Sequence, residues 1–584
     1  MLKIKNNQLH NDRTSQIVSW GHWFTLFNIF LVIALGSRYL FIADWPATFL
    51  GRVYAVISCI GHFSFLAFVI YLITLFPLSF FISSVRWQRI IAILIATISI
   101  SLLLIDIEIF TRFRMHLSFS LWQILTSPDD NILSAKWQRL FIFVPFMLLL
   151  QTLFAIWSWR KLRSLTKRRR LSYPFIAIFV ICFLSSHLIH IWADANFYRP
   201  ITMQRSSLPL SYPLTARHLL ERYGFIQSGD YNTRIEQEGN PFAIAVEYPL
   251  GKISYQKSNH PYNILMITVD EWNEINQQKT MPIFSKFAHE NIEFTSHYSA
   301  STKDYLGQFS LFYGLDPNYY QSILASHKSS ALIDTLTKQH YNIGLFASDG
   351  FNHALYRYAL LLNFSIPETN KISSVQATTD YWLTWHKEQT NTNASPWFSI
   401  IEYRKSPKQN KVGDASLQFM KNIDNSLAKI LEEIKTTNQQ DNTIIIVTAS
   451  NKQQQHANTI NFNREDLHVP LAIAWPNKEN QTFNEVTTHV DIMQTIMQNA
   501  LGVTNTPTQY SQGQNLFDST VRKWITVGDE MSISALYQDK VISINNSGQY
   551  QIFDKSGNYQ NHEKLGLSTF LQLVTQNRRF MVTN

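Results

Sequence analysis

Long apolar stretches dominate the first third of the chain and predict helices that cross a membrane. Five of them reach the roughly 20 residues needed to span about 30 Å of hydrocarbon, and short polar segments separate them. Five such runs in succession favour membrane spans over the buried core helices of a soluble domain. The first run lies too far into the chain for a cleaved signal peptide, and no small-residue cleavage site follows it. The predicted spans cover residues 23–42, 53–82, 90–110, 140–159 and 174–192.

A different pattern, in which apolar strands alternate with amphipathic helices, begins at residue 261. The strands over 263–270, 397–403 and 443–450 are almost continuously apolar, as in a parallel sheet whose two faces are both covered. Residues 414–435 predict a helix that Asp414 caps, with one apolar face made of Met420, Ile423, Leu427, Ile430 and Ile434. The last sixty residues contain short strands, which we expect to pair antiparallel and to close one edge of the sheet.

The sequence therefore predicts two domains of different fold class. At 584 residues it is too long for one compact core. We expect a five-helix transmembrane domain over residues 1–193 and an α/β domain with a mainly parallel sheet and a small antiparallel C-terminal part over residues 261–584. Residues 194–260 contain several prolines, which interrupt regular structure, and are expected to form a juxtamembrane linker or arm.

The distribution of basic residues predicts the orientation of the spans. Lysines and arginines are concentrated in the N-terminal arm, in the second loop and above all in the fourth loop, residues 160–170. Because such residues favour the cytoplasmic side, the N-terminus is expected inside, and everything after the fifth span outside, in the periplasm of a bacterium. The net charge of +9 then reflects residues that orient the spans and contact lipid headgroups, rather than a surface that binds nucleic acid. Cys59 and Cys182 both lie in predicted spans, so the outer domain has no disulfide.

The arm contains a short helical segment close to the membrane. Thr215 is a suitable N-cap, and Gly224 is a suitable end. Arginines here, among them Arg217 and Arg222, favour contact with anionic headgroups, because the planar guanidinium binds phosphate with two hydrogen bonds. The alternative is an ordinary linker whose arginines reach the interface without binding a specific lipid.

Polar residues at the predicted strand ends are the candidates for chemistry, since side chains at the carboxyl ends of parallel strands converge. Asp270 and Glu271 could bind a hard cation through oxygen, and Ser301 or Thr302 could serve as a nucleophile if activated. His468 precedes a strand and could bind metal or phosphate. Each has a structural alternative: carboxylates cap helices, hydroxyls bond their own backbone, and an isolated histidine is often structural.

The order of these segments resembles a known family. "ILMITVDEW", "LFASDG", "IIIVTAS" and "HVPLAIAWP" are similar to the sulfatase branch of the alkaline phosphatase superfamily, over residues 261–515. The five spans, "IWADANFYRPITMQRSSLPLSYPLTARHLLERYG" and "FSLFYGLDPNYY" resemble the YejM family, also called PbgA, of Gram-negative inner membranes. That second resemblance extends over nearly the whole chain.

The superfamily resemblance implies a site for one or two divalent metals. The first acidic ligand falls on Asp270, the nucleophile on Ser301 or Thr302 within residues 301–304, and a final ligand on His468. The Asp-His or Asp-Asn pair of active members falls on Ser450 and Asn451, which carry no charge. A divalent site without that carboxylate lacks charge compensation. We therefore expect a degenerate hydrolase that binds Mg²⁺, Mn²⁺ or Zn²⁺ weakly at Asp270, Asn451 and His468, and no certain cofactor.

The YejM resemblance implies a regulator. Members of the family sense lipopolysaccharide and restrain LapB, an adaptor that delivers the deacetylase LpxC to proteolysis. The lipid A phosphates would be held by Arg217 and Arg222 and by helix-start amides beside Thr215, those of Ala216, Arg217 and His218. His218 stands where the family has a second arginine. Two alternatives remain: a metal-dependent phosphatase or phosphoethanolamine-type transferase acting on envelope lipids, and a protein that binds or carries an anionic phospholipid such as cardiolipin.

Overall fold

The computed structural model describes residues 2–43, 45–82, 84–119, 121–122, 138–162, 170, 172–225, 230–258, 260–272, 277–366, 373–392, 395–405, 414–452, 464–518, 521–530, 532–537, 539–545, 549–554, 558–560, 563 and 565–581. The chain divides into two compact units. The first contains residues 1–231 with the short segments 566–571 and 582–584, and the second contains residues 232–565 and 572–581. Residues 194–260, which we expected to form a separate arm, are thus divided between the two units.

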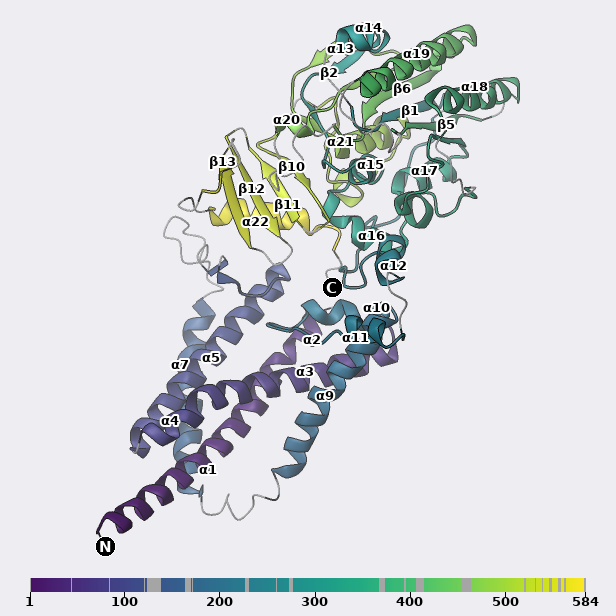
Figure 1. Cartoon of the computed structure of the whole chain (residues 1–584). Coiled ribbons are helices and arrows are strands. Elements are labelled where there is room, and N and C mark those ends of the chain that lie inside the picture. The colour runs from purple at the N-terminus through teal and green to yellow at the C-terminus, as the bar shows by residue number, and fades with distance from the viewer. Residues whose placement is uncertain are drawn as a thin grey trace. The chain divides into compact units, whose positions relative to one another are not determined.

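The first unit consists of long helices (Figure 1). They are α1 (Leu2–Gly36), α3 (Phe49–Ile70), α5 (Val85–Phe113), α7 (Gln138–Arg160) and α9 (Tyr173–Ala195). A π-helical turn, η1 (Tyr71–Leu75), joins α3 to α4 (Phe76–Phe81), and α2 (Arg38–Ile42) follows α1.

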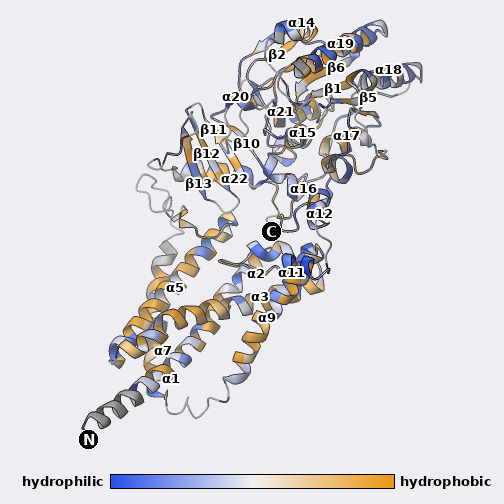
Figure 2. Ribbon diagram, viewed as in Figure 1, coloured by the Kyte–Doolittle hydropathy of each residue, from blue (hydrophilic) through white to orange (hydrophobic). Residues whose placement is uncertain are grey.

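Five helical segments of the first unit are long and apolar enough to cross a membrane, and they extend each predicted span at one or both ends. They cover Arg13–Ile42, Phe49–Phe81, Val85–Phe113, Ile142–Arg160 and Tyr173–Ala195. Apolar residues cover these helices along most of their length (Figure 2). The prediction of five spans is confirmed. Most of the basic loop over 160–170 lies outside the described residues.

Short elements follow the last span. These are α10 (Arg199–Thr202), the 3-10 turn η3 (Met203–Ser206), α11 (Arg217–Arg222) and α12 (Asp230–Glu238), within which the two units divide. Three histidines contact η3 and the extended segment that follows it. His116, which follows α5, has its Nε2 3.1 Å from the carbonyl oxygen of Ser206, and His62 of α3 has its Nε2 2.7 Å from that of Pro209. His190 Nδ1 lies 3.1 Å from the carbonyl oxygen of Leu214.

The second unit is built on a seven-stranded sheet with the strand order β4-β5-β1-β6-β7-β2-β8. The strands β4, β5, β1 and β6 run parallel, and β7 is antiparallel to β6 and β2. The mainly parallel sheet is therefore as predicted. Their bounds are β1 (Asn263–Val269), β2 (Ile292–Phe294), β4 (Asn342–Ala347), β5 (Trp397–Tyr403), β6 (Thr443–Ala449), β7 (Leu471–Ala474) and β8 (Gln481–Phe483).

Two apolar cores cover the two faces of this sheet, which explains the unbroken apolar character of its strands. Ile264 and Met266 of β1 belong to one core, and Leu265 and Ile267 belong to the other. The first core includes α15 (Asp304–Tyr313), α16 (Tyr320–Ser326), α17 (Ala331–Lys338) and α21 (His489–Thr495). The second includes α14 (Pro282–Glu290), α18 (Val375–Thr392) and α19 (Asp414–Thr436), on whose inner side all five predicted apolar residues are buried.

The C-terminal strands form a sheet of their own, β10 (Ile525–Gly528), β11 (Ser532–Leu536), β12 (Lys540–Asn545) and β13 (Tyr550–Asp554). All three pairings are antiparallel, as predicted. The expectation that they close an edge of the main sheet is wrong, because no strand of the main sheet is hydrogen-bonded to them among the described residues. The chain continues to α22 (Leu567–Asn577).

Candidate functional site

The carboxyl ends of β4, β5, β1 and β6 lie next to one another because these strands are parallel neighbours. Asp349 follows β4, Asp270 follows β1, and Ser450 and Asn451 follow β6. Asp304 joins them as the first residue of α15. Sequence reasoning thus located the correct edge of the sheet. It missed the residues at the end of β5, which occupy the middle of the arrangement.

Arg404, the residue after β5, is the centre of this edge. Its guanidinium lies 2.8 Å from a carboxylate oxygen of Asp304, 3.2 Å from one of Asp349 and 2.8 Å from one of Glu402. Arg404 is mostly buried, with a side chain 14% exposed. Three carboxylates converge on one cation, as they would on a metal ion, but the cation belongs to the chain. We call Asp304, Asp349, Glu402 and Arg404 the arginine cluster.

Glu402 has further partners that fix its geometry. The hydroxyl of Tyr356 donates to Glu402 Oε2 at 2.6 Å, and Gln308 Nε2 donates to Glu402 Oε1 at 3.4 Å. Burial raises the pKa of Glu402, and Arg404 opposes that rise. Burial by itself would lower the pKa of Arg404, but its carboxylates, Glu402 first, raise the pKa well above the usual range. The guanidinium is therefore a permanent charge of this site.

Asp270 lies beside the cluster in an unfavourable place for a carboxylate. Burial, together with the charge of Asp304, raises the pKa of Asp270 to about 8, even though Arg404 acts in the opposite direction. A carboxyl group with that pKa is mostly protonated at neutral pH. The next residue, Glu271, has a left-handed backbone with φ of 50°, and its carboxylate lies 3.1 Å from the ammonium of the buried Lys405. A second internal cation thus neutralises the second acidic residue.

Ser450 and Asn451 use their polar atoms to connect the strand ends. Asn451 Oδ1 accepts from the backbone N–H of Glu271 at 3.0 Å and from the Ser450 hydroxyl at 3.1 Å. Asn451 Nδ2 donates to the carbonyl oxygen of Thr302 at 3.2 Å. The backbone is also tight here, because a Cβ on Gly307 would lie 2.0 Å from the carbonyl oxygen of Ser450.

The side chains expected to hold a metal do not form a ligand set among the described residues. Asp270 and Asn451 follow the neighbouring strands β1 and β6, but Asn451 Oδ1 already accepts two hydrogen bonds. His468 Nε2 lies 2.8 Å from the carbonyl oxygen of Thr295, so this nitrogen carries the proton and is not a ligand. The described part of the chain contains no group of three or more His, Cys, Asp or Glu side chains placed to bind one ion. These donors do not fit a divalent metal.

The hydroxyls of Ser301 and Thr302 lack an activating base among the described residues. Ser301 is buried, and its hydroxyl accepts the backbone N–H of Lys303 at 3.3 Å. The nearby His353 stacks on Tyr305, with ring centroids 4.6 Å apart, and burial lowers the pKa of His353 to about 4. Its Nδ1 accepts the backbone N–H of Leu355. No carboxylate or imidazole of the described residues hydrogen-bonds to either hydroxyl.

The predicted helix of the arm forms, but its start differs from the prediction. The helix α11 begins at Arg217, its N-cap is Ala216, and Ala216 makes no side-chain capping bond. The prediction of Thr215 as N-cap is therefore wrong, and the six-residue helix is too short to offer a phosphate site at its amides. The end is as expected, because α11 finishes at Arg222 and Gly224 has φ of 74°.

Arg217 is bound to a carboxylate of the last span. Its Nε and one terminal nitrogen each donate to Asp194 at 3.0 Å, and its guanidinium lies 3.9 Å from the ring centroid of Tyr231. Asp194 is 1% exposed, and Arg217 is 35% exposed. Tyr231 also donates its hydroxyl to Asp194 at 3.0 Å. Arg217 thus anchors α11 to the end of α9, whereas His218 and Arg222 are exposed, one helical turn apart.

The residues that sequence reasoning missed are Glu402, Arg404 and Lys405. The strand over 397–403 was predicted correctly, and the polar residues at its end carried the same signal that identified Asp270 and Asn451. The rule that active residues follow parallel strands, applied to this strand as well, would have found them. Asp194 was not a candidate because it lies at the end of an apolar helix, 23 residues before its partner Arg217.

Comparison with known proteins gives two family matches and full-length relatives. Residues 7–255 match the "Domain of unknown function (DUF3413)" family, and residues 263–503 match the Sulfatase family. The chain is 42% identical to the inner membrane protein YejM of Salmonella typhimurium, over 99% of this chain and 100% of that protein. It is 38% identical to an uncharacterized protein of Haemophilus influenzae, over 95% and 93% of the two chains.

One solved structure that is similar is a protein of the alkaline phosphatase superfamily from Vibrio parahaemolyticus. It has a TM-score of 0.45 and 14% identity over 60% of this chain and 95% of that one. The full-length identity to YejM and the match of the α/β unit to the Sulfatase family agree with the five apolar helices and the mainly parallel sheet described above. The chain therefore belongs to the YejM family of inner membrane proteins.

Proposed function

We propose that this protein is a lipopolysaccharide sensor of the inner membrane that restrains a LapB-like adaptor and so protects LpxC from proteolysis. The observation that carries the lipid-binding part is a run of exposed apolar side chains in the segment between η3 and residue 225. Leu210, Tyr212, Leu214, Leu219, Tyr223 and Phe225 are each between 57% and 77% exposed. We call residues 207–225 the interfacial segment.

Such exposure is uncommon on a surface that faces only water. A segment with exposed leucines and aromatic rings beside cationic side chains is typical of chain that lies in the headgroup region of a bilayer. Tyrosines are favoured there because the ring is apolar and the hydroxyl is polar. The contacts of His62 to Pro209 and of His190 to Leu214 hold the interfacial segment against two of the membrane helices.

The basic residues of the interfacial segment divide into an anchor and a binding pair. Arg217 holds the buried carboxylate of Asp194, so we assign it to positioning α11. His218 and Arg222 are exposed and one turn apart, which suits them to the phosphates of lipid A. A charge-assisted hydrogen bond contributes about 1.5–3 kcal/mol. Loss of one such bond should weaken lipid binding by roughly one to two orders of magnitude, so loss of both side chains should weaken it by at least about tenfold.

The arginine cluster supports a regulatory rather than a hydrolytic role for the α/β unit. An arginine already neutralises Asp304, Asp349 and Glu402. The hydroxyls of Ser301 and Thr302 have no carboxylate or imidazole bonded to them in the described structure. We propose that this unit is a folded scaffold that presents a surface to other envelope components. The orientation follows from the loop charges: the N-terminus is cytoplasmic and the α/β unit periplasmic.

The test measures lipopolysaccharide bound to the full-length protein purified in detergent. We expect His218→Ala with Arg222→Ala to lower bound lipopolysaccharide at least tenfold and to change the level of LpxC in cells, because the restraint on LpxC degradation should respond to the bound lipid. The matched control is Lys286→Ala, which removes an exposed cation from the α/β unit. Parallel measurements use cardiolipin, the lipid of the alternative function.

Three results would contradict the proposal. Equal lipopolysaccharide binding by the double variant and the parent would remove the assigned binding pair. A preference for cardiolipin over lipid A would favour a phospholipid-binding function. Stoichiometric metal in the purified protein, with phosphatase activity that Asp270→Ala abolishes, would establish the α/β unit as an enzyme.

A further inference from the structure

Two histidines of the last span hold the backbone of Leu214 through both of its polar groups. The backbone N–H of Leu214 donates to His187 Nδ1 at 3.1 Å, and His190 Nδ1 lies 3.1 Å from the carbonyl oxygen of the same residue. The two histidines are three positions apart in α9, which places them on one face of that helix. Leu214 belongs to the interfacial segment and lies just before α11. We call His187 and His190 the histidine clamp.

The two bonds of the histidine clamp require different protonation states. A backbone N–H can only donate, so Nδ1 of His187 must carry a lone pair and no proton. A backbone carbonyl can only accept, so Nδ1 of His190 carries a proton. A second proton on His190 leaves its bond in place. A proton on Nδ1 of His187 instead removes the acceptor and places two donors opposite each other, so this bond exists only while the His187 ring is neutral.

The surroundings of His187 do not compensate a positive charge on its ring. The ring packs on Phe183, with centroids 4.7 Å apart, and it is half-buried. No carboxylate of the described residues is hydrogen-bonded to His187. Asp194, one turn beyond His190, is already bound to Arg217. Protonation of His187 should therefore favour separation from Leu214 rather than a new contact within the histidine clamp.

Other titratable and charged groups near the histidine clamp are mostly basic. Like charges nearby make a further proton on the clamp less favourable to hold. These groups come from the elements packed around α9: Arg205 of η3 beside His190, His62 of α3 beside His187, Arg199 of α10, which donates to Met203, and Tyr54 of α3, whose ring centroid lies 6.4 Å from that of His190.

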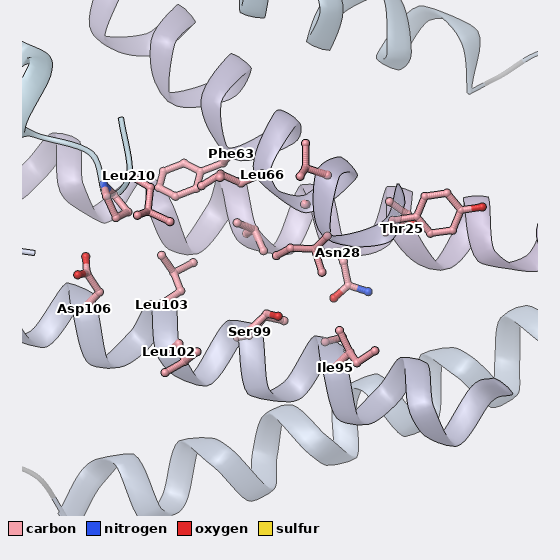
Figure 3. Close-up of a pocket in the computed structure, with 18 of the residues that line it drawn as sticks. Thr25, Asn28, Phe63, Leu66, Ile95, Ser99, Leu102, Leu103, Asp106 and Leu210 are labelled. Carbon is pink, nitrogen blue, oxygen red and sulfur yellow. The ribbon is translucent and has the colours of Figure 1, made fainter. Parts of the chain in front are cut away.

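The contacts that hold the preceding residues do not require a neutral histidine. His62 Nε2 and His116 Nε2 lie beside the carbonyl oxygens of Pro209 and Ser206, so both nitrogens donate and still donate when the rings are charged. Leu210, next along the segment, lines the same cavity as residues of α3 such as Phe63 (Figure 3). Acid should therefore loosen the chain near residue 214 and leave the chain before residue 210 attached.

We propose that the histidine clamp is a pH-sensitive switch that releases the interfacial segment at Leu214 when the solution at that end of α9 becomes acidic. An unperturbed histidine takes up its proton near pH 6.5. Because one proton separates the closed from the open form, the open population should rise by up to about tenfold for each pH unit below that value. The proposal concerns how the interfacial segment is attached, so it does not depend on whether that segment binds lipid A.

The test measures hydrogen exchange of the full-length protein in phosphatidylethanolamine and phosphatidylglycerol nanodiscs. Exchange rates are converted to protection factors at each pH, so that the intrinsic pH dependence of exchange cancels. We expect the protection of the Leu214 amide to be constant above about pH 7.5 and to fall by up to about tenfold per pH unit below about pH 6.5. The amides of residues 203–207 should keep their protection over the same range.

Asparagine substitutions separate the two bonds, because the asparagine amide places its oxygen and nitrogen near the position of Nδ1 and does not titrate. His187→Asn can still accept from Leu214, so it should keep the protection seen at pH 8 and lose the pH dependence. His190→Asn can still donate, so it should keep the pH dependence of the parent. His289→Asn, an exposed histidine of the α/β unit, is the matched control and should change nothing.

His187→Phe removes the acceptor at every pH. It should lower the protection of the Leu214 amide at pH 8 by about two- to tenfold, as for the loss of one hydrogen bond, and leave little further change in acid. The proposal is overturned if the parent shows no pH dependence at Leu214, if His187→Asn keeps the pH dependence of the parent, or if His187→Phe equals the parent at pH 8. Should His187→Phe fail to fold, the comparison of His187→Asn with the parent still decides.

Discussion

Removal of the Arg404 guanidinium should destabilise the α/β unit strongly, because three carboxylates would lose their common cation. Arg404 is 14% exposed and Glu402 is 1% exposed, with Asp349 and Asp304 at 13% and 25%. Truncation of one partner of a buried ion pair costs about 3–5 kcal/mol. We expect Arg404→Ala to lower the free energy of unfolding by an amount in this range at pH 8.

The cost should depend on pH in a defined direction. Burial raises the pKa of Glu402, and Arg404 counteracts that rise, so the variant should raise the folded-state pKa further above the unfolded value. A carboxyl group whose pKa is higher in the folded than in the unfolded protein makes the fold less stable as pH rises through the folded-state pKa. The variant should therefore be closer to the parent at pH 5 than at pH 8.

Hydrogen exchange of peptides from β1, β5 and β6 measures this free energy within the α/β unit itself. The control Lys429→Ala breaks an exposed pair of 3.9 Å with Asp380 and should cost less than about 1 kcal/mol. In Arg404→Ala the three carboxylates are left without a cation, and Mn²⁺ can take its place. At a hundred times its Kd, Mn²⁺ should raise the free energy of unfolding of Arg404→Ala by about 2.7 kcal/mol and leave that of the parent unchanged. Equal protection of Arg404→Ala and the parent would refute the arginine cluster, and destabilisation that Mn²⁺ leaves unchanged would refute the comparison with a metal site.

Three further predictions concern other residues. Arg217→Ala should destabilise the junction of α11 and α9 by about 3 kcal/mol, because Asp194 keeps only the Tyr231 hydroxyl, and proteolysis near residue 225 measures this; unchanged protection would contradict the anchor. Burial raises the pKa of Asp316 from 3.8 to about 7, so the protein loses stability as pH rises from about 4 to 7. Asp316→Asn should remove that loss and raise the free energy of unfolding, measured in urea at pH 8, by up to about 4 kcal/mol. An unaltered dependence of stability on pH would disprove this. A reporter that is active only in the cytoplasm, fused after Asn584, should stay silent if the α/β unit is periplasmic, and a strong signal would reverse the orientation.

Two predictions failed because packing and strand pairing overrode what the local sequence indicated. Thr215 is a good capping residue, but the contact between Arg217 and Asp194 sets where α11 begins, and this places Ala216 at the N-cap. The C-terminal strands pair with one another as a separate sheet because four of them, β10 to β13, satisfy each other's backbone groups. In the first case a contact with a residue 23 positions earlier decided the outcome, and in the second case pairing between successive strands did.

The sequence by itself determined the five apolar helices and the order of strands and helices in the α/β unit. An apolar run of twenty residues has few stable alternatives to a span, and a strand buried on both faces is recognisable from its composition. It also identified the edge of the sheet to which Asp270, Asp304 and Asn451 belong, because the carboxyl ends of parallel strands coincide.

Only the tertiary structure decided what that edge contains and how the membrane helices pack. The order β4-β5-β1-β6 differs from the order along the chain and brings Arg404 between carboxylates from 100 residues earlier and 55 residues earlier, Asp304 and Asp349. The packing of α1 against both α3 and α5 likewise joins segments that are distant in the sequence. Packing between distant segments depends on the shapes of all the side chains involved, so neither feature is encoded in a local pattern.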